Sequence, residues 1–327
     1  MVAGTSGVGG VIGIIVIGRN EGERLIRCLA SLPMNGNVIV YVDSGSTDGS
    51  CEAATAADAC VVSLDLSTPF TAARARNAGI AALQDKQWPI DYVQFIDGDC
   101  ELDRQWLDTA RTFLEKNARV AVVCGRRRER FPERSIYNAM CDAEWNTPVG
   151  EASACGGDAL MRFGPLVEAN GYDVALLAGE EPELCARLRA LGWKIWRIDA
   201  PMTMHDAALT DFRQWWRRAI RGGFGYAQVW TTMKGRSGRL YGRQLMRALL
   251  WGGALPLAIL AIALMWWPAA VAIALIYPVQ VVRLALRGAS WSSAVLTMLA
   301  KFAELVGVVR FSLAHAAGRY SAPPSYK

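Results

Sequence analysis

The stretch Tyr92-Val93-Gln94-Phe95-Ile96-Asp97-Gly98-Asp99 places two carboxylates directly after a run of strand-forming residues. Its aromatic and β-branched residues favour a buried strand, and the Asp-Gly-Asp sequence ends that strand. Because side chains two residues apart in a strand point the same way, Asp97 and Asp99 are expected on one side of the strand's end. In an open α/β sheet, this C-terminal end of the strands is where ligands bind.

Two carboxylates in this position repel each other unless a cation lies between them. Hard divalent ions such as Mg²⁺ or Mn²⁺ prefer oxygen ligands of this kind, usually together with the phosphates of a substrate. The alternative interpretation is a solvated Asp-Gly turn between a strand and a helix. The stretch therefore favours a metal site only if other polar motifs gather at the same edge.

Apolar runs of strand length alternate with segments of helical periodicity through the first 200 residues. Strands are expected at 11–17, 38–42, 60–64, 92–97, 120–125 and 193–198, and helices at 23–32, 70–83, 102–116 and 180–191. This rhythm is typical of βαβ units and predicts an α/β fold built on a parallel sheet.

The composition of the 327 residues points to a membrane-associated protein in a reducing compartment. The net charge of +5 is mild, but the mean hydropathy of +0.17 is high for a soluble enzyme. Eight cysteines are scattered singly, without a Cys-x-x-Cys pair, which disfavours a zinc site or a disulfide scaffold.

The sequence changes character at residue 211. Residues 211–247 hold nine Lys or Arg and one acid, interleaved with Trp and Tyr, as expected beside an anionic leaflet. Residues 248–282 hold no charged residue, and as helix they would measure about 50 Å, too long for one crossing of ~30 Å. A hairpin of two short spans turning near Trp266-Trp267-Pro268 fits this length and keeps the flanking arginines on the cytosolic side.

Four regions are therefore predicted along the chain. They are a catalytic domain over 1–210, a basic and aromatic interfacial segment over 211–247, a membrane region over 248–318 and a disordered tail over 319–327. Within the membrane region, residues 292–318 carry Lys301, Glu304 and Arg310 in an apolar background, which favours an interfacial amphipathic helix over a third span. A buried helical hairpin in a soluble protein is the alternative.

Four motifs then converge on the C-terminal edge of the predicted sheet. They are Arg19-Asn20-Glu21, Asp43-Ser44-Gly45-Ser46-Thr47-Asp48, Ala75-Arg76-Asn77-Ala78-Gly79 and Asp97-Gly98-Asp99. With these motifs in this order, the sequence resembles the family 2 glycosyltransferases of the GT-A fold over residues 13–226. The resemblance implies a Rossmann-like mixed or parallel sheet flanked by helices, and it argues against a dinucleotide-binding protein, since no Gly-x-Gly-x-x-Gly turn follows the first strand.

The resemblance implies a role for each motif. Arg19, Asn20 and Glu21 would lie beside the nucleotide, Asp43 would bind its base, and Arg76 would steady nucleotide or phosphate unless it lies on a solvated helix face. Asp97 would hold the ribose or the metal, and Asp99 the metal directly. His205, after the last strand, stands where some members have a further metal ligand, although a lone histidine is often structural. The implied cofactor is Mg²⁺ or Mn²⁺.

Glu180-Glu181 resembles the Glu-Asp pair that the family has at a helix start. An inverting transfer needs a general base for the acceptor hydroxyl, and the second acid of the pair holds that role in the family, which favours Glu181. Because Glu replaces the usual Asp, Glu180 and Glu181 both stay candidates. Carboxylates that only complement the helix dipole are the alternative.

Gln214-Trp215-Trp216-Arg217-Arg218 is similar to the Gln-x-x-Arg-Trp signature of processive members, except that Arg replaces the final Trp. Processive synthesis is therefore not predicted. Arg217 and Arg218 either clamp the diphosphate or belong to a plain interfacial helix.

These features predict a metal-dependent, inverting glycosyltransferase of hexosyltransferase type in cell-surface polysaccharide or glycoconjugate synthesis. It would act at the cytosolic face of the cell membrane, with a nucleoside-diphosphate sugar as donor, a lipid-linked or glycan acceptor and no nucleic-acid partner. The alternatives are a polyprenyl-phosphate glycosyltransferase and a catalytically silent nucleotide-binding membrane scaffold.

Overall fold

The protein is described here by a computed structural model that covers residues 10–34, 36–233 and 240–318. The chain forms two compact units. Unit 1 comprises Met1–Arg130, Trp145–Val174 and Glu180–Ala207, and unit 2 comprises Phe131–Glu144, Ala175–Gly179 and Ala208–Lys327. The four regions predicted from the sequence stay a prediction.

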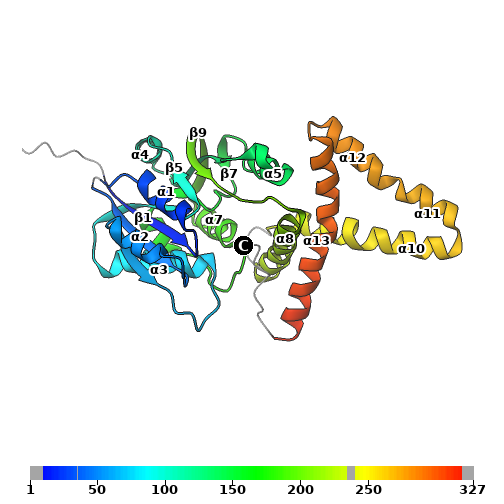
Figure 1. The fold of residues 1–327 in the computed structure, drawn as a ribbon, viewed down its shortest axis with the longest axis horizontal. Helices are drawn as coiled ribbons and strands as arrows, with labels where there is room; N and C mark the ends of the chain where they lie inside the picture. Colours follow the sequence, from blue (N-terminus) through cyan, green and yellow to red (C-terminus); the bar gives the residue numbers. More distant parts are fainter. Residues whose placement is uncertain (1–9, 35, 234–239, 319–327) are drawn as a thin grey trace, which may run out of the picture. The chain divides into compact units, whose positions relative to one another are not determined.

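Unit 1 is built on one sheet with the strand order β3-β2-β1-β4-β8-β6-β9-β5, and β7 pairs with β9 (Figure 1). The strands are β1 (Val11–Gly18), β2 (Val38–Asp43), β3 (Cys60–Ser63), β4 (Ile90–Asp97), β5 (Cys100–Leu102), β6 (Val120–Glu129), β7 (Gly150–Ala152), β8 (Ala159–Arg162) and β9 (Lys194–His205). The first four strands of this order are parallel, while β8 runs antiparallel between β4 and β6. The predicted α/β class with a mixed sheet is confirmed.

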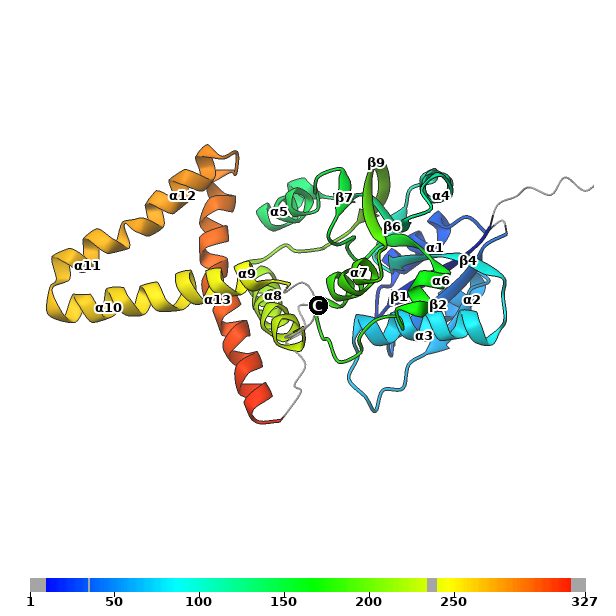
Figure 2. The same cartoon turned by 180° about the vertical axis from the view of Figure 1, so that it is seen from behind.

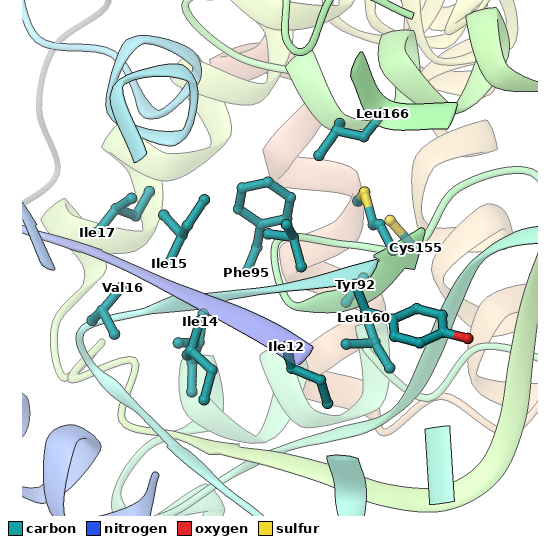
Figure 3. Packing of buried hydrophobic residues seen from close by; sticks show 14 of the residues in the cluster. Ile12, Ile14, Ile15, Val16, Ile17, Tyr92, Phe95, Cys155, Leu160 and Leu166 are labelled. Carbon is teal, nitrogen blue, oxygen red and sulfur yellow. The ribbon is translucent and has the colours of Figure 1, made fainter. Parts of the chain in front are cut away.

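The core of unit 1 forms around β1, whose residues are almost all buried because the strand is covered on both faces. Ile15, Ile17 and Phe95 lie on one side of the sheet, and Ile12 and Ile14 on the other (Figure 3). This alternation follows from the two-residue period of a strand and explains why β1 reads as a continuous apolar run.

Helices cover this sheet and connect its strands. In unit 1 they are α1 (Glu23–Ser31), α2 (Ser50–Ala56), α3 (Ala72–Asp85), α4 (Trp106–Lys116), α6 (Phe163–Glu168) and α7 (Glu180–Ala190). Helices α1, α3 and α7 agree with the predicted helices, and α4 begins four residues later than expected because Cys100–Leu102 forms the edge strand β5. Helices α2 and α6 are not among the helices expected from the sequence.

Two strands also run further than the sequence pattern indicates. The strand expected to end at residue 125 continues to Glu129, and the one expected to end at 198 continues to His205. The extensions pair with each other in parallel, with Glu129 opposite His205, and β5 pairs with β9 so that Cys100 lies opposite His205. Hydrogen bonding between distant segments therefore lengthens both strands beyond their apolar parts.

Unit 2 is helical in its described residues. It contains the 3₁₀ turn Pro132–Arg134, α5 (Ile136–Glu144), α8 (Phe212–Thr232), α9 (Gly242–Arg247), the π-helical segment Ala248–Ala254, α10 (Leu255–Met265), α11 (Trp267–Ala274), α12 (Ile276–Leu286) and α13 (Trp291–Ala316). Asp211 caps α8 through a capping box with Gln214, which fixes where this long helix begins.

Three stretches of helix are long and apolar enough to cross a membrane: Gly242–Met265, Trp267–Leu286 and Trp291–Ala316. The chain breaks at Trp266 between the first two, where the hairpin was predicted to turn (Figure 1). Membrane association is therefore indicated by both sequence and structure. The third stretch is the helix for which the sequence favoured an interfacial position, and that position stays a prediction.

Helices α8 and α13 cross at a point where their backbones touch (Figure 2). A Cβ atom at Gly223 would lie 1.9 Å from the carbonyl oxygen of Glu304, and one at Gly307 would lie 2.0 Å from that of Ile220. Small residues at such crossings allow close backbone packing. Glycine is therefore required at both positions.

We expect Gly223→Ala to destabilise unit 2, because its methyl group has no space against the α13 backbone. Overpacking of this kind lowers the melting temperature by roughly 2–10 °C. Gly222→Ala is the matched control, since a Cβ there meets only Tyr226 at an ordinary 3.6 Å. Thermal unfolding of the detergent-solubilised protein measures both variants, and equal melting temperatures would contradict the crossing.

The apolar stretches predict which treatments extract the full chain from a membrane. Detergent should extract it from membrane fractions, whereas high salt should not, because salt screens charges but leaves the burial of apolar helices unchanged. Fractionation with immunodetection measures the release. Complete release by salt alone would mean that the protein is held only by its basic residues.

Candidate active site

The site forms at the C-terminal end of β4, where Asp97 is held by two arginines. Its Oδ1 lies 3.1 Å from Nη2 of Arg76, and its Oδ2 lies 3.5 Å from Nη1 of Arg127. Burial alone would raise the pKa of Asp97, but Arg76 and Arg127 lower it below its usual value. Asp97 is therefore an ionised carboxylate in a cationic setting.

Arg76 connects two parts of the site. It lies on α3, whose start is fixed by the side chain of Thr71, and it is only 3 % exposed. Its Nη2 contacts Asp97, and its Nη1 contacts Oε1 of Glu180 at 2.7 Å. The alternative of a solvated helix face is therefore wrong for Arg76.

Asp99 and His205 form a second cluster. Oδ1 of Asp99 lies 3.3 Å from Nε2 of His205, and Nδ1 of His205 lies 3.6 Å from Oε2 of the buried Glu129. Burial and Arg127 would lower the pKa of His205, but the two carboxylates raise it above its usual value. The order carboxylate, imidazole, carboxylate is also the arrangement in which a second carboxylate orients a metal-binding histidine.

The donor atoms of this second cluster fit a divalent cation. Asp99 and His205 offer ligand atoms within 4.8 Å of one another, together with the thiol of Cys100. Burial raises the pKa of this thiol well above its usual value, so it is a neutral group and a poor ligand for a hard ion. Oxygen and imidazole are the ligands that suit Mn²⁺ or Mg²⁺ here.

Arg127, Asp158 and Thr203 form a third group beside the first two. Asp158 is 0 % exposed, and its Oδ2 lies 3.1 Å from Nη1 of Arg127 and accepts from the hydroxyl of Thr203 at 2.7 Å. Its Oδ1 accepts from the backbone N–H of Asp97 at 3.2 Å. Asp158 therefore fixes Arg127 against the end of β4.

Trp145 covers this region with its ring. The guanidinium of Arg127 lies 4.9 Å from the ring centroid, and the ring meets His205 edge-on at 4.8 Å. The indole thus contacts the cation of one cluster and the imidazole of the other. Contact of this kind holds both side chains in place.

Glu180 and Glu181 have different surroundings although they are neighbours at the start of α7. Glu180 is paired with Arg76, whereas Oε1 of Glu181 accepts from the backbone N–H of Cys155 at 2.5 Å and from the thiol of Cys185 at 3.1 Å. Glu181 is 7 % exposed, and this burial raises its pKa above its usual value. A carboxylate with a raised pKa is the better proton acceptor near neutral pH.

The loops after β1 and β2 are tied to each other by hydrogen bonds. The backbone N–H of Asn20 donates to the hydroxyl of Ser46 at 2.9 Å, and the backbone N–H of Thr47 donates to the side-chain oxygen of Asn20 at 2.8 Å. Burial alone would raise the pKa of Asp43, but hydrogen bonds from the side chain and backbone of Ser46 and from the backbone of Gly45 bring this pKa below its usual value. Hydrogen bonds therefore join the two loops at the C-terminal edge of the sheet.

The other residues predicted beside the nucleotide differ in their exposure. Arg19 is exposed, whereas Glu21 is buried and paired with Arg24 at 2.6 Å. Arg217 and Arg218 belong to α8 in unit 2, where Nη1 of Arg218 lies 2.9 Å from Oε2 of Glu144. The contacts described above link Asp97, Asp99, His205, Arg76 and Glu180 within unit 1, and Arg217 and Arg218 are not among them.

The sequence contains a signal for three further residues of the site, Arg127, Glu129 and Asp158. Residues 126–130 read as a basic stretch, but their continuation of a strand places Arg127 and Glu129 on one face, toward Asp97 and His205. Asp158 follows two glycines, and at Gly157 a Cβ would meet Arg76 and Asp97 at 3.1 and 3.2 Å. Only a residue without a side chain allows the loop to approach these groups so closely.

Comparison with solved structures shows the same fold in a known protein. A mannosyltransferase from Pyrobaculum calidifontis, in complex with GDP-Man and Mn²⁺, matches 94 % of this chain and 88 % of its own length with a TM-score of 0.56 and 17 % identity. TarS from S. aureus matches 73 % of this chain and 43 % of its own length with a TM-score of 0.46 and 15 % identity. A search of curated protein sequences gives no match.

Comparison with protein-family models identifies the domain to which the site belongs. The model described as glycosyl transferase family 2 matches residues 13–159. This range includes both strand-end loops, α3 with Arg76, and the Asp97 and Asp99 carboxylates. Residues 13–159 therefore match a family 2 glycosyltransferase domain, and the fold is GT-A-like.

Proposed function

We propose that this protein is a metal-dependent, inverting glycosyltransferase that moves a sugar from a nucleoside-diphosphate donor to a lipid-linked or glycan acceptor. The observation that carries this proposal is the division of the carboxylates of the site into three roles. Asp97 is neutralised by arginines, Asp99 lies against a histidine, and Glu181 is held as a buried base. These are the roles that such a reaction requires.

Asp99 and His205 would hold the metal ion, with Glu129 orienting the imidazole. When bound, Mg²⁺ or Mn²⁺ would offset the negative charge that develops on the leaving diphosphate. Asp97 then serves the nucleotide side, since Arg76 and Arg127 already balance its charge. The same two guanidinium groups are suited to contact the phosphates of the donor.

Glu181 would act as the general base. The hydroxyl oxygen of the acceptor attacks the anomeric carbon, the bond from that carbon to the diphosphate oxygen breaks, and the hydroxyl proton passes to Glu181. Both donors to Glu181 contact Oε1, so Oε2 is assigned to the acceptor proton. Glu180 is the poorer candidate because its carboxylate is already engaged in an ion pair with Arg76.

The apolar helices favour an acceptor that is available at a membrane surface. The basic residues that flank the candidate spans favour a catalytic domain on the cytosolic face, in cell-surface polysaccharide or glycoconjugate synthesis. Ranking acceptors tests this part, because rapid glycosylation of bare polyprenyl phosphate would select the polyprenyl-phosphate alternative.

We expect hydrolysis of the donor sugar to stop when a chelator is added and to return with Mn²⁺ or Mg²⁺. Asp99→Asn should lower this activity on the order of 100-fold or more, because a neutral amide is a much weaker ligand for a hard cation. Asp199→Asn, on an exposed position of β9, is the matched control. The measurement is release of nucleoside diphosphate across a panel of nucleotide sugars, and turnover that ignores the chelator would overturn the metal role.

The proposed role of Glu181 as general base predicts how kcat/KM depends on pH. Glu181 must be ionised to accept a proton, and burial raises its pKa, so kcat/KM should fall with decreasing pH through a value above the ordinary glutamate pKa of about 4.3. Glu181→Gln should lower kcat by roughly 10²–10⁴-fold and remove this acid limb. Glu180→Gln should keep the acid limb. If the two variants exchange these behaviours, Glu180 is the base, and if neither matters, the scaffold alternative gains support.

A further inference from the structure

The basic stretch from Arg126 to Arg130 is divided between two faces of unit 1. Arg127 and Glu129 point into the site described above, where they contact Asp97, Asp158 and His205. Because strand residues alternate between faces, Arg126, Arg128 and Arg130 lie on the opposite side. Three cations are thus left that the proposed transfer reaction does not use.

These three arginines line a groove of about 620 Å³. Glu101 of β5 joins them, with Asp103 and Arg104 from the segment between β5 and α4, and Pro201 and Met204 of β9 contribute an apolar floor. All of these residues belong to unit 1. The groove is therefore built from three segments that are far apart in the sequence.

The charge of the groove is positive but not uniform. Four arginines face two acids, and one of these acids, Glu101, is already paired with Arg130 and with Arg27, whose Nε lies 3.0 Å from its Oε1. Arg104 and Arg128 are exposed. Same-face residues of a strand lie roughly 6.6 Å apart, so the row of arginines suits a ligand with repeated negative charges.

The mixture of groups selects among anionic ligands. Of the described residues that line the groove, none is aromatic, so the stacking platform typical of single-stranded nucleic-acid sites is not present among them. Arginines beside Asp, Glu and Gln instead fit a chain that carries both carboxylates and hydroxyl groups.

We infer that the outer face of β6, with Arg104, Arg126, Arg128 and Arg130, is a binding groove for an acidic glycan. The arginines bind the carboxylates of the sugar units, and Asp103 and Gln105 accept hydrogen bonds from their hydroxyl groups. This groove is separate from the proposed donor site, because the two use opposite faces of the same strand. Ligand binding there does not require turnover.

Direct binding to the full-length, detergent-solubilised chain tests the groove. A fluorescently labelled oligogalacturonate should bind, with an affinity that falls as salt rises, and a neutral maltooligosaccharide of the same length should not. Arg104→Gln with Arg128→Gln should weaken binding by about ten-fold or more, as the loss of two charge-assisted contacts requires. Fluorescence anisotropy measures these affinities without a donor sugar.

The matched control is Arg111→Gln with Arg119→Gln, which removes the same charge from positions outside the groove. This control should bind as the unmodified chain does. Equal binding by the two double variants, or equal binding of the neutral oligosaccharide, would overturn the inference, and tighter binding of oligothymidylate would assign the groove to nucleic acid. Retained donor hydrolysis in the groove variant shows that it folds, so a negative binding result leaves the proposed transfer reaction untouched.

Discussion

The compensation of buried carboxylates at the end of β4 is the constraint on which the rest of unit 1 depends. Asp97, Asp158 and Glu129 lie in or beside the interior, where an unpaired charge would cost several kcal/mol. For Asp97 and Asp158 the protein meets this cost with two arginines from separate elements, Arg76 on α3 and Arg127 on β6, while Glu129 contacts His205. Each arginine contacts two acids, so the helix, the strand and the loop before β8 are all fixed by the same charge balance.

The same balance gives the acids different chemistry. Two arginines lower the pKa of Asp97, whereas Glu181 has hydrogen-bond donors but no paired cation among the contacts described above, and its burial dominates. Carboxylates that lie close together in the fold can therefore have different roles. Asp97 is an anion that pairs with cations, and Glu181 is a base that can accept a proton. The neighbours Glu180 and Glu181 differ for this reason and not because of their sequence position.

Local sequence was sufficient to predict the parallel part of the sheet, but not the part that completes the site. The strands that end near Asp43 and Asp97 are apolar runs with their own turn signals, and their order predicted the α/β class. The pairing of β6 with β9, which places Glu129 opposite His205, joins polar segments and depends on contacts between distant residues. The sequence pattern shows only apolar periodicity and turns. Both strands were therefore predicted to end where their apolar residues end.

Helix α13 illustrates the same limit in unit 2. Lys301 and Glu304 made the sequence favour an interfacial position, because separate charges are costly in a membrane core. In the structure the Lys301 ammonium lies 2.6 Å from Glu304 Oε1, and both side chains are largely buried. The glycine contacts bring α8 against this part of α13, with Gly223 beside the Glu304 backbone. A neutral pair shielded by a neighbouring helix costs much less than two separate charges, so composition alone overstates the penalty for burying this helix in a membrane.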